Sequence, residues 1–153
     1  MTVPGLNGGI AGIASFVASG QQQECCVAST NSCGTTPTLT ASGLASATAT
    51  SGFVLSAHDL PGQRFAALLL STAGRTSVPF GSGTLCLQAP SFVAVQRASG
   101  TAGLCDGVVS VDVNALAGPT FLDQPGTLVQ AQFLGRDGAS AALTQAIEFS
   151  ICD

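Results

Sequence analysis

The chain of 153 residues contains no lysine, no tryptophan and no tyrosine, a single histidine and only 8% charged residues. Its four arginines are opposed by eight acids, which gives a formal net charge of -4. Neutralising a phosphate backbone requires a cluster of basic residues, whereas Arg64, Arg75, Arg97 and Arg136 stand far apart in the sequence. We therefore expect no nucleic-acid partner and no binding to an anionic membrane surface.

Tryptophan and tyrosine usually supply the exposed rings on which proteins bind sugars, so their absence disfavours a lectin. The chain also has no run of about 18 apolar residues, the length needed to cross a bilayer, and we expect no transmembrane segment. With so few charges, Ser, Thr, Gly, Ala and Gln must cover much of the surface. Apolar patches that such a surface exposes usually mark interfaces, which favours self-association.

Residues 1–24 form an apolar segment rich in Gly and Ala, and residues 25–153 have the length and composition of one domain. Residues 1–20 resemble a weak secretion signal, but the basic start of such a signal is missing. The alternatives are that the uncharged stretch from Pro4 to Val17 supplies a strand to a neighbouring copy, or that it lies on its own domain.

The six cysteines are Cys25, Cys26, Cys33, Cys86, Cys105 and Cys152. Their spacing lacks the paired C-x2-C pattern of zinc sites, so we expect up to three disulfides and no bound metal. The adjacent Cys25 and Cys26 are expected to choose different partners; the connectivity otherwise stays open, as does the alternative of buried thiols. Disulfides would place the protein outside the cytoplasm, in an extracellular or cell-surface setting.

Short apolar or alternating runs, separated by Gly, Pro and Asp turn signals, predict β-strands throughout. A helical period is absent except for 139–146, which is compatible with a short helical turn. The pattern predicts an all-β fold, an immunoglobulin-like or jelly-roll-type sandwich of about seven to nine strands. The expected strands are 38–41, 47–50, 53–57, 65–70, 85–87, 92–97, 108–113, 128–134 and 146–152. The Ser- and Thr-rich stretch 29–51 also has the composition of a linker or an O-glycosylated segment.

His58-Asp59 is the one place where a histidine base and a carboxylate coincide. Neighbours in a strand point to opposite faces, so this pair is a weak catalytic candidate. Gly81-Ser82-Gly83 only superficially resembles a nucleophile elbow. Asp106, Asp112 and Asn114, or the surroundings of Asp137, contain oxygen ligands for calcium, although no calcium-loop motif is present. We expect no catalytic residue, no cofactor and no enzymatic activity.

From about residue 25 to residue 152 the chain resembles a small Gly/Pro-rich β-sandwich module found near the ends of secreted bacterial proteins. The resemblance is carried by Cys25, Asn31-Ser32, Gly34, Ala41-Ser42-Gly43, Leu60-Pro61-Gly62-Gln63-Arg64-Phe65, Gly83-Thr84-Leu85-Cys86-Leu87, Asp112-Val113-Asn114-Ala115-Leu116, Gln124-Pro125-Gly126-Thr127, Gln130-Ala131-Gln132-Phe133, Arg136-Asp137 and Thr144-Gln145-Ala146-Ile147. It implies a pairing of Cys25 with Cys86 and no catalytic chemistry.

These observations predict a non-catalytic extracellular protein with a structural or adhesive role, which associates with itself into a surface assembly or filament. The alternative is a glycan- or calcium-binding accessory module of a larger secreted system.

Overall fold

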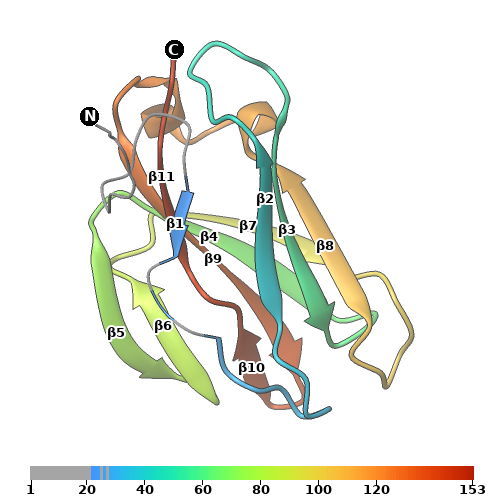
Figure 1. Cartoon of the computed structure of the whole chain (residues 1–153). Helices are drawn as coiled ribbons and strands as arrows, with labels where there is room; N and C mark the ends of the chain where they lie inside the picture. Colours follow the sequence, from blue (N-terminus) through green and yellow to red (C-terminus); the bar gives the residue numbers. More distant parts are fainter. Residues whose placement is uncertain (1–21, 25, 27) are drawn as a thin grey trace, which may run out of the picture.

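The computed structural model describes residues 22–24, 26 and 28–153, and nearly all of its regular structure is β-strand (Figure 1). The strands are β1 (Gln22–Glu24), β2 (Thr38–Gly43), β3 (Phe53–Leu60), β4 (Phe65–Ser71), β5 (Arg75–Phe80), β6 (Gly83–Leu87), β7 (Phe92–Arg97), β8 (Gly107–Asp112), β9 (Leu128–Asp137), β10 (Ser140–Leu143) and β11 (Ile147–Ser150). Two short 3-10 helices, η1 (Val113–Ala115) and η2 (Thr120–Asp123), lie between β8 and β9. Within the described residues, no helix is long and apolar enough to span a bilayer.

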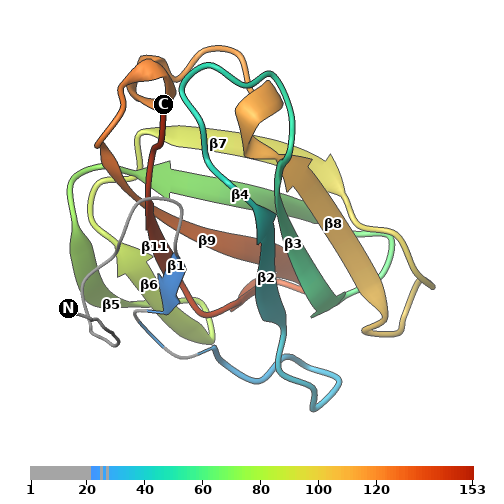
Figure 2. The same cartoon turned by 45° about the horizontal axis from the view of Figure 1, so that its top comes forward.

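The strands form the two layers of a sandwich (Figures 1 and 2). The larger sheet has the order β1-β11-β9-β4-β7, with β10 also paired to β9, and the smaller sheet has the order β2-β3-β8. The expected all-β, disulfide-stabilised sandwich is confirmed, but it has more strands than the seven to nine expected. The long strand β9 pairs with two short strands, β10 and β11, and β5 and β6 form a separate hairpin.

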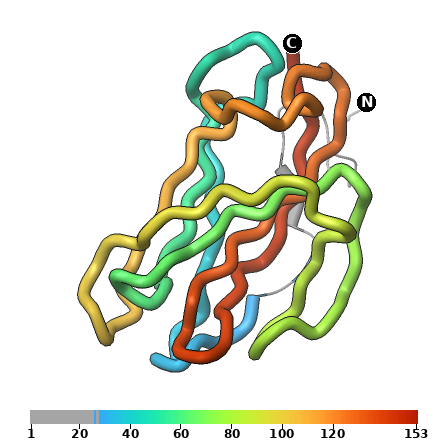
Figure 3. The backbone as a smooth tube through the Cα atoms, turned by 180° about the vertical axis from the view of Figure 1, so that it is seen from behind, coloured from blue at the N-terminus to red at the C-terminus, as the bar shows by residue number. Residues whose placement is uncertain are grey.

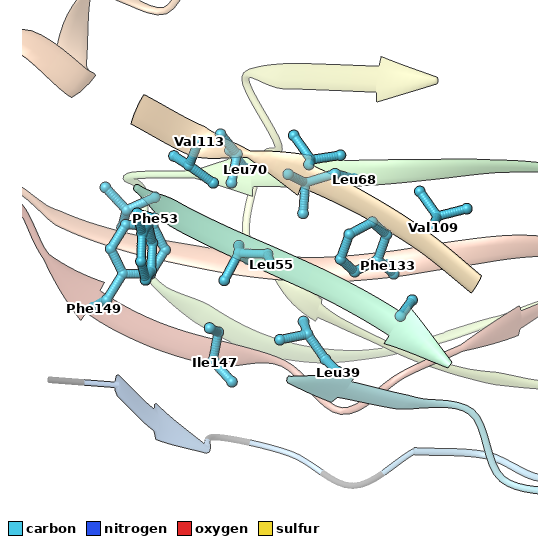
Figure 4. Close-up of a cluster of buried hydrophobic side chains, with 14 of the residues drawn as sticks. Leu39, Phe53, Leu55, Leu68, Leu70, Val109, Val113, Phe133, Ile147 and Phe149 are labelled. Carbon is cyan, nitrogen blue, oxygen red and sulfur yellow. The ribbon is translucent and has the colours of Figure 1, made fainter. Parts of the chain in front are cut away.

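The core lies between the two sheets and follows the alternation of each strand. In β3, Phe53 and Leu55 are buried, while the intervening Val54 is partly exposed. The facing side chains of the larger sheet include Phe133 and Phe149 (Figure 4). The rings of Phe53 and Phe149 meet edge to face with their centroids 4.8 Å apart, an arrangement that adds to the stabilisation from burial.

The β5–β6 hairpin covers part of the outer face of the larger sheet. Its turn contains Gly81 with φ +58°, and a Cβ there would lie 3.1 Å from the amide nitrogen of Ala141 on β10. Ser82 Oγ donates to Ala141 O at 3.0 Å. Glycine therefore permits both the backbone conformation and the close approach of the hairpin tip to β10.

Two glutamines of β9 are fully buried beneath this hairpin. Gln132 Oε1 accepts from the amide of Cys86 at 3.0 Å, and its Nε2 donates to the carbonyls of Thr84 and Thr144 at 3.0 and 2.8 Å. Gln130 Oε1 accepts from the amide of Gly74 at 3.0 Å. These side chains thus satisfy backbone groups of β6, of the residue before β5 and of the residue after β10, and they link the hairpin to β9.

A buried carboxylate completes the attachment of the hairpin. Glu148 Oε1 lies 2.5 Å from Arg75 Nη2, and Glu148 Oε2 accepts from Gln130 Nε2 at 2.8 Å. Burial alone would raise the pKa of Glu148, but the hydrogen bonds from Arg75 and Gln130, together with the arginine charge, bring that pKa below its ordinary value. The carboxylate thus stays charged under the hairpin.

Two disulfides lie among the described residues, Cys26–Cys86 and Cys33–Cys105, with Cα–Cα distances of 6.4 and 6.0 Å. The pairing of Cys25 with Cys86 is wrong, because Cys86 is bonded to Cys26. Cys26 packs in a small apolar cluster with Cys86 and Leu87. Because Cys25 and Cys26 are adjacent, the sequence alone does not show which of them lies next to Cys86. Cys25 lies outside the described residues.

Cys152 is half-buried in the C-terminal segment, beside the loop that follows β2. Its amide donates to the carbonyl of Ala45 at 2.8 Å, and its carbonyl accepts from the amide of Ala47 at 2.7 Å. Of the N-terminal segment 1–24, the structure describes only Gln22–Glu24, which form β1 and pair with β11.

Two local predictions are wrong. Residues 47–50 are a loop rather than a strand, because Ser46 Oγ accepts from the amides of Thr48 and Ala49 and so replaces a strand ladder. Residues 139–146 contain β10 instead of a helical turn, because Gly138, with φ +63°, reverses the chain and pairs β10 with β9.

Candidate functional site: an open sheet edge and an arginine-lined groove

The outer face of the larger sheet is exposed where the β5–β6 hairpin does not cover it. In the view from behind, β4 and β7 cross this region with the hairpin beside them (Figure 3). Alternation along each strand places Phe65, Ala67 and Leu69 of β4 on the outer face, opposite Arg97, Val95 and Val93 of β7 respectively.

Large apolar side chains are unusually exposed on this face. Phe65 retains 54% of its accessible surface, Val93 51% and Val95 62%. Phe80, at the end of β5, retains 43%. Single exposed apolar side chains are common on soluble proteins, but a contiguous group of this kind marks a candidate binding surface.

Beside these residues the face is hollowed. A groove of about 780 Å³ is lined by Gln63, Arg64, Phe65, Ala66, Ala67, Val95, Arg97, Ala102, Leu134 and Arg136, and we call it the arginine groove. A second hollow of about 360 Å³ shares Leu134 and Arg136 with it and extends to Phe80 and Ala141. The apolar floor therefore continues from β4 and β9 toward the hairpin tip.

Three of the four arginines of the chain line this groove. Arg97 is held in place by its Nη1, which donates to the carbonyl of Gln63 at 2.9 Å, and its guanidinium carbon lies 4.8 Å from the centroid of the Phe65 ring. Within the described residues the one ion pair joins Arg75 to Glu148. Arg64, Arg97 and Arg136 thus surround an apolar surface and have no carboxylate partner among the described residues.

Sequence reasoning missed this cluster because Arg64, Arg97 and Arg136 lie more than thirty residues apart. A usable signal was present, since each arginine flanks the end of an apolar run of strand length. Only the order of the strands in the sheet shows that these ends lie side by side.

Strand β7 ends the larger sheet and pairs only with β4 among the described strands. The amide of Ala98 donates to the carbonyl of Arg64 at 2.8 Å, and this bond shows which residues of β7 direct their peptide groups toward β4. Because peptide groups alternate in direction along an antiparallel strand, those of Val93 and Val95 point away from β4. Inside β7 there is no proline and no charged residue before Arg97, so the usual protection of an edge strand is missing.

The structure does not bring the weak catalytic candidates together. His58 Nε2 lies 3.1 Å from Thr40 Oγ1 on the smaller sheet, whereas Ser82 is in the β5–β6 turn on the outer side of the larger sheet. Asp59 has φ +59° at the irregular end of β3, where its carbonyl accepts from Asn31 Nδ2 at 2.8 Å.

The candidate calcium ligands each satisfy a backbone amide. Asp106 Oδ1 accepts from Thr101 N at 2.7 Å, a hydrogen bond that lowers the pKa of Asp106. Asp112 Oδ2 accepts from Gly52 N at 2.9 Å, and Asp137 Oδ2 accepts from Ser32 N at 2.8 Å. Among residues 22–24, 26 and 28–153, no group of three or more His, Cys, Asp or Glu is placed to hold a metal ion.

Comparison of the chain with protein-family models, with curated proteins and with solved structures finds no match.

Proposed function

We propose that this protein is a non-catalytic, extracellular structural or adhesive subunit that associates with further copies of itself by strand addition at β7. The observation that carries the proposal is the open edge of β7, where the exposed Val93 and Val95 flank outward-facing peptide groups. An edge of this kind is a template for another strand, and soluble proteins that remain monomeric usually block it with charge or proline.

The two edges of the larger sheet support an open-ended assembly. Strand β1 lies at the edge of the larger sheet opposite β7, and in the proposed assembly the donor strand leaves from that edge. If each copy donates a strand from this edge to β7 of the next copy, the interface is heterologous and repeats head to tail. Such an interface builds a filament, unless the rotation between copies closes the assembly into a ring. Residues 4–17, the expected donor, lie outside the described residues, and their role stays a prediction.

The disulfides Cys26–Cys86 and Cys33–Cys105 indicate an oxidising environment during folding. An extracellular or cell-surface location is the setting that we propose on this basis. The low charge of the chain fits the same role, because surfaces that are covered in an assembly need little ionic hydration.

The experiment compares the purified oxidised protein with Val93→Lys, with a deletion of residues 1–20 and with Ser42→Lys as a control. Lysine at position 93 places a charge on the β7 edge, whereas exposed Ser42 lies on β2 of the smaller sheet. We expect polymers for the parent chain and for Ser42→Lys in mass measurement and negative-stain imaging, and monomers for Val93→Lys.

If the deleted segment is the donor strand, the deletion also yields monomers; intact polymers after deletion would assign the pairing to another segment. A parent chain that stays monomeric at high concentration contradicts self-association. Monomers that bind a glycan array or calcium would instead favour the accessory-module function.

A further inference from the structure

We infer that the arginine groove binds an elongated amphipathic anion, a carboxylate with an unbranched apolar chain of the fatty-acid kind. The inference does not depend on self-association, because the groove lies on the outer face of the sheet and the proposed association uses its edge.

Small side chains, among them Ala67, line the floor of the groove. Ala67 lies between Phe65 and Leu69 on the outer face of β4, and across the sheet it faces Val95 on one side and Leu134 on the other. Because the alanine side chain ends at Cβ, the surface of β4 is lower at Ala67 than at Phe65 and Leu69, whose longer side chains project outward. The resulting volume of about 780 Å³ is in the range of about 300 to 1,000 Å³ that is usual for small-molecule sites.

The charge of the groove selects an anion. Each guanidinium carries five N–H donors in a planar fork that matches a carboxylate. Arg97 uses Nη1 on the carbonyl of Gln63, and Arg136 uses Nε on the carbonyl of Gly138. The remaining donors of Arg64, Arg97 and Arg136 meet no carboxylate in the described part of the chain. In a protein of net charge -4, this concentration of positive charge is local and complements a single anionic group.

The length of the apolar floor selects an extended ligand over a compact one. The second hollow continues from Leu134 to Phe80 and Ala141, which provides an apolar path beyond the arginines. Burying an alkyl chain there would strengthen binding about fourfold for each methylene removed from water. A single nucleic-acid strand fits less well, because the arginine groove contains one aromatic ring, Phe65, whereas stacking of successive bases needs several rings in a row.

The test is a calorimetric or NMR titration of the whole oxidised protein with dodecanoate, kept below its micelle concentration. Two further probes separate head from tail: dodecyltrimethylammonium has the same chain with a positive head, and butyrate has the same head with a short chain. We expect saturable binding of dodecanoate to one site, and binding of either other probe at least about tenfold weaker.

The variants test the site itself. Arg97→Gln and Arg136→Gln are each expected to weaken dodecanoate binding by about tenfold or more, since each removes a charged hydrogen-bond donor. Ala67→Leu keeps every charge but places three more carbon atoms on the floor of the groove, where they would displace part of the alkyl chain, and it should also weaken binding. Ala115→Leu, at an exposed position on η1, is the matched control for Ala67→Leu, and the folding of every variant is checked by circular dichroism.

Equal binding of dodecanoate and dodecyltrimethylammonium would overturn the inference, because it would show apolar adsorption without selection by charge. Unchanged binding in a folded Ala67→Leu variant would overturn it as well. Binding of an acidic peptide without binding of dodecanoate would assign the groove to a protein partner and reject the proposed ligand.

Discussion

Replacing Gln132 by leucine tests whether buried glutamines hold the β5–β6 hairpin to the sheet. Gln132 is fully buried and makes three hydrogen bonds to backbone groups, one from the amide of Cys86 and two to the carbonyls of Thr84 and Thr144. Leucine preserves most of the volume but leaves all three backbone groups without this partner.

The expected loss follows from these contacts. An unsatisfied buried amide costs about 1 to 3 kcal/mol, and each carbonyl that loses a hydrogen bond contributes about 1 kcal/mol more. Burial of the apolar leucine side chain stabilises the fold by about 1 to 2 kcal/mol and offsets part of this loss. The free energy of unfolding of Gln132→Leu should therefore be lower than that of the parent chain by about 1 to 4 kcal/mol.

Urea denaturation with the disulfides intact measures this loss, and hydrogen exchange of the Cys86 amide localises it. Gln124→Leu, at an exposed loop position, is the control and should change stability by less than about 0.5 kcal/mol. A loss below about 1 kcal/mol, or unchanged protection of the Cys86 amide, would refute the role that we assign to Gln132.

Two further predictions concern the same hairpin. Because the pKa of Glu148 is lowered in the folded protein, its charge stabilises the fold above the ordinary value of 4.5, and this stabilisation is lost as the pH falls through the lowered pKa. Glu148→Gln should thus be less stable than the parent chain at pH 7 by about 1 to 2 kcal/mol, with a smaller difference at pH 3 in urea denaturation; a difference that does not change with pH contradicts this. Replacing both Cys26 and Cys86 by serine opens a crosslink between residues 60 positions apart and should lower the free energy of unfolding by up to about 4 kcal/mol, and no change in the urea midpoint would contradict it.

The strands were predictable wherever apolar residues alternate or run together, because that signal is local. The expected strand 92–97 coincides with β7, and the clean alternation of Ile147–Ile151 marks β11. Prediction failed at 47–50, where only Ala and Thr alternate and neither fixes a buried face. It also failed at 139–146, where alanine favours helix while the pairing with β9 decides for a strand.

The functional surface was less predictable because it depends on which strands become neighbours. Alternation along β9 assigns Gln130 and Gln132 to a solvent-facing side, and only the hairpin that folds over them explains their burial. The same limit applies to the arginines, whose separation in sequence suggested no basic patch. Chain order does not specify that the ends of β4, β7 and β9 meet around one groove.

The open edge and the groove are compatible because they use perpendicular directions of the same sheet. A strand added at β7 extends the sheet in its own plane through the peptide groups of Val93 and Val95. The groove opens along the normal to that plane, over Ala67 and Leu134. If every copy is joined to the next by the same strand addition at β7, every copy has the same orientation relative to that interface. The grooves would then form a regular array along the assembly and would stay open while the β7 edges are paired.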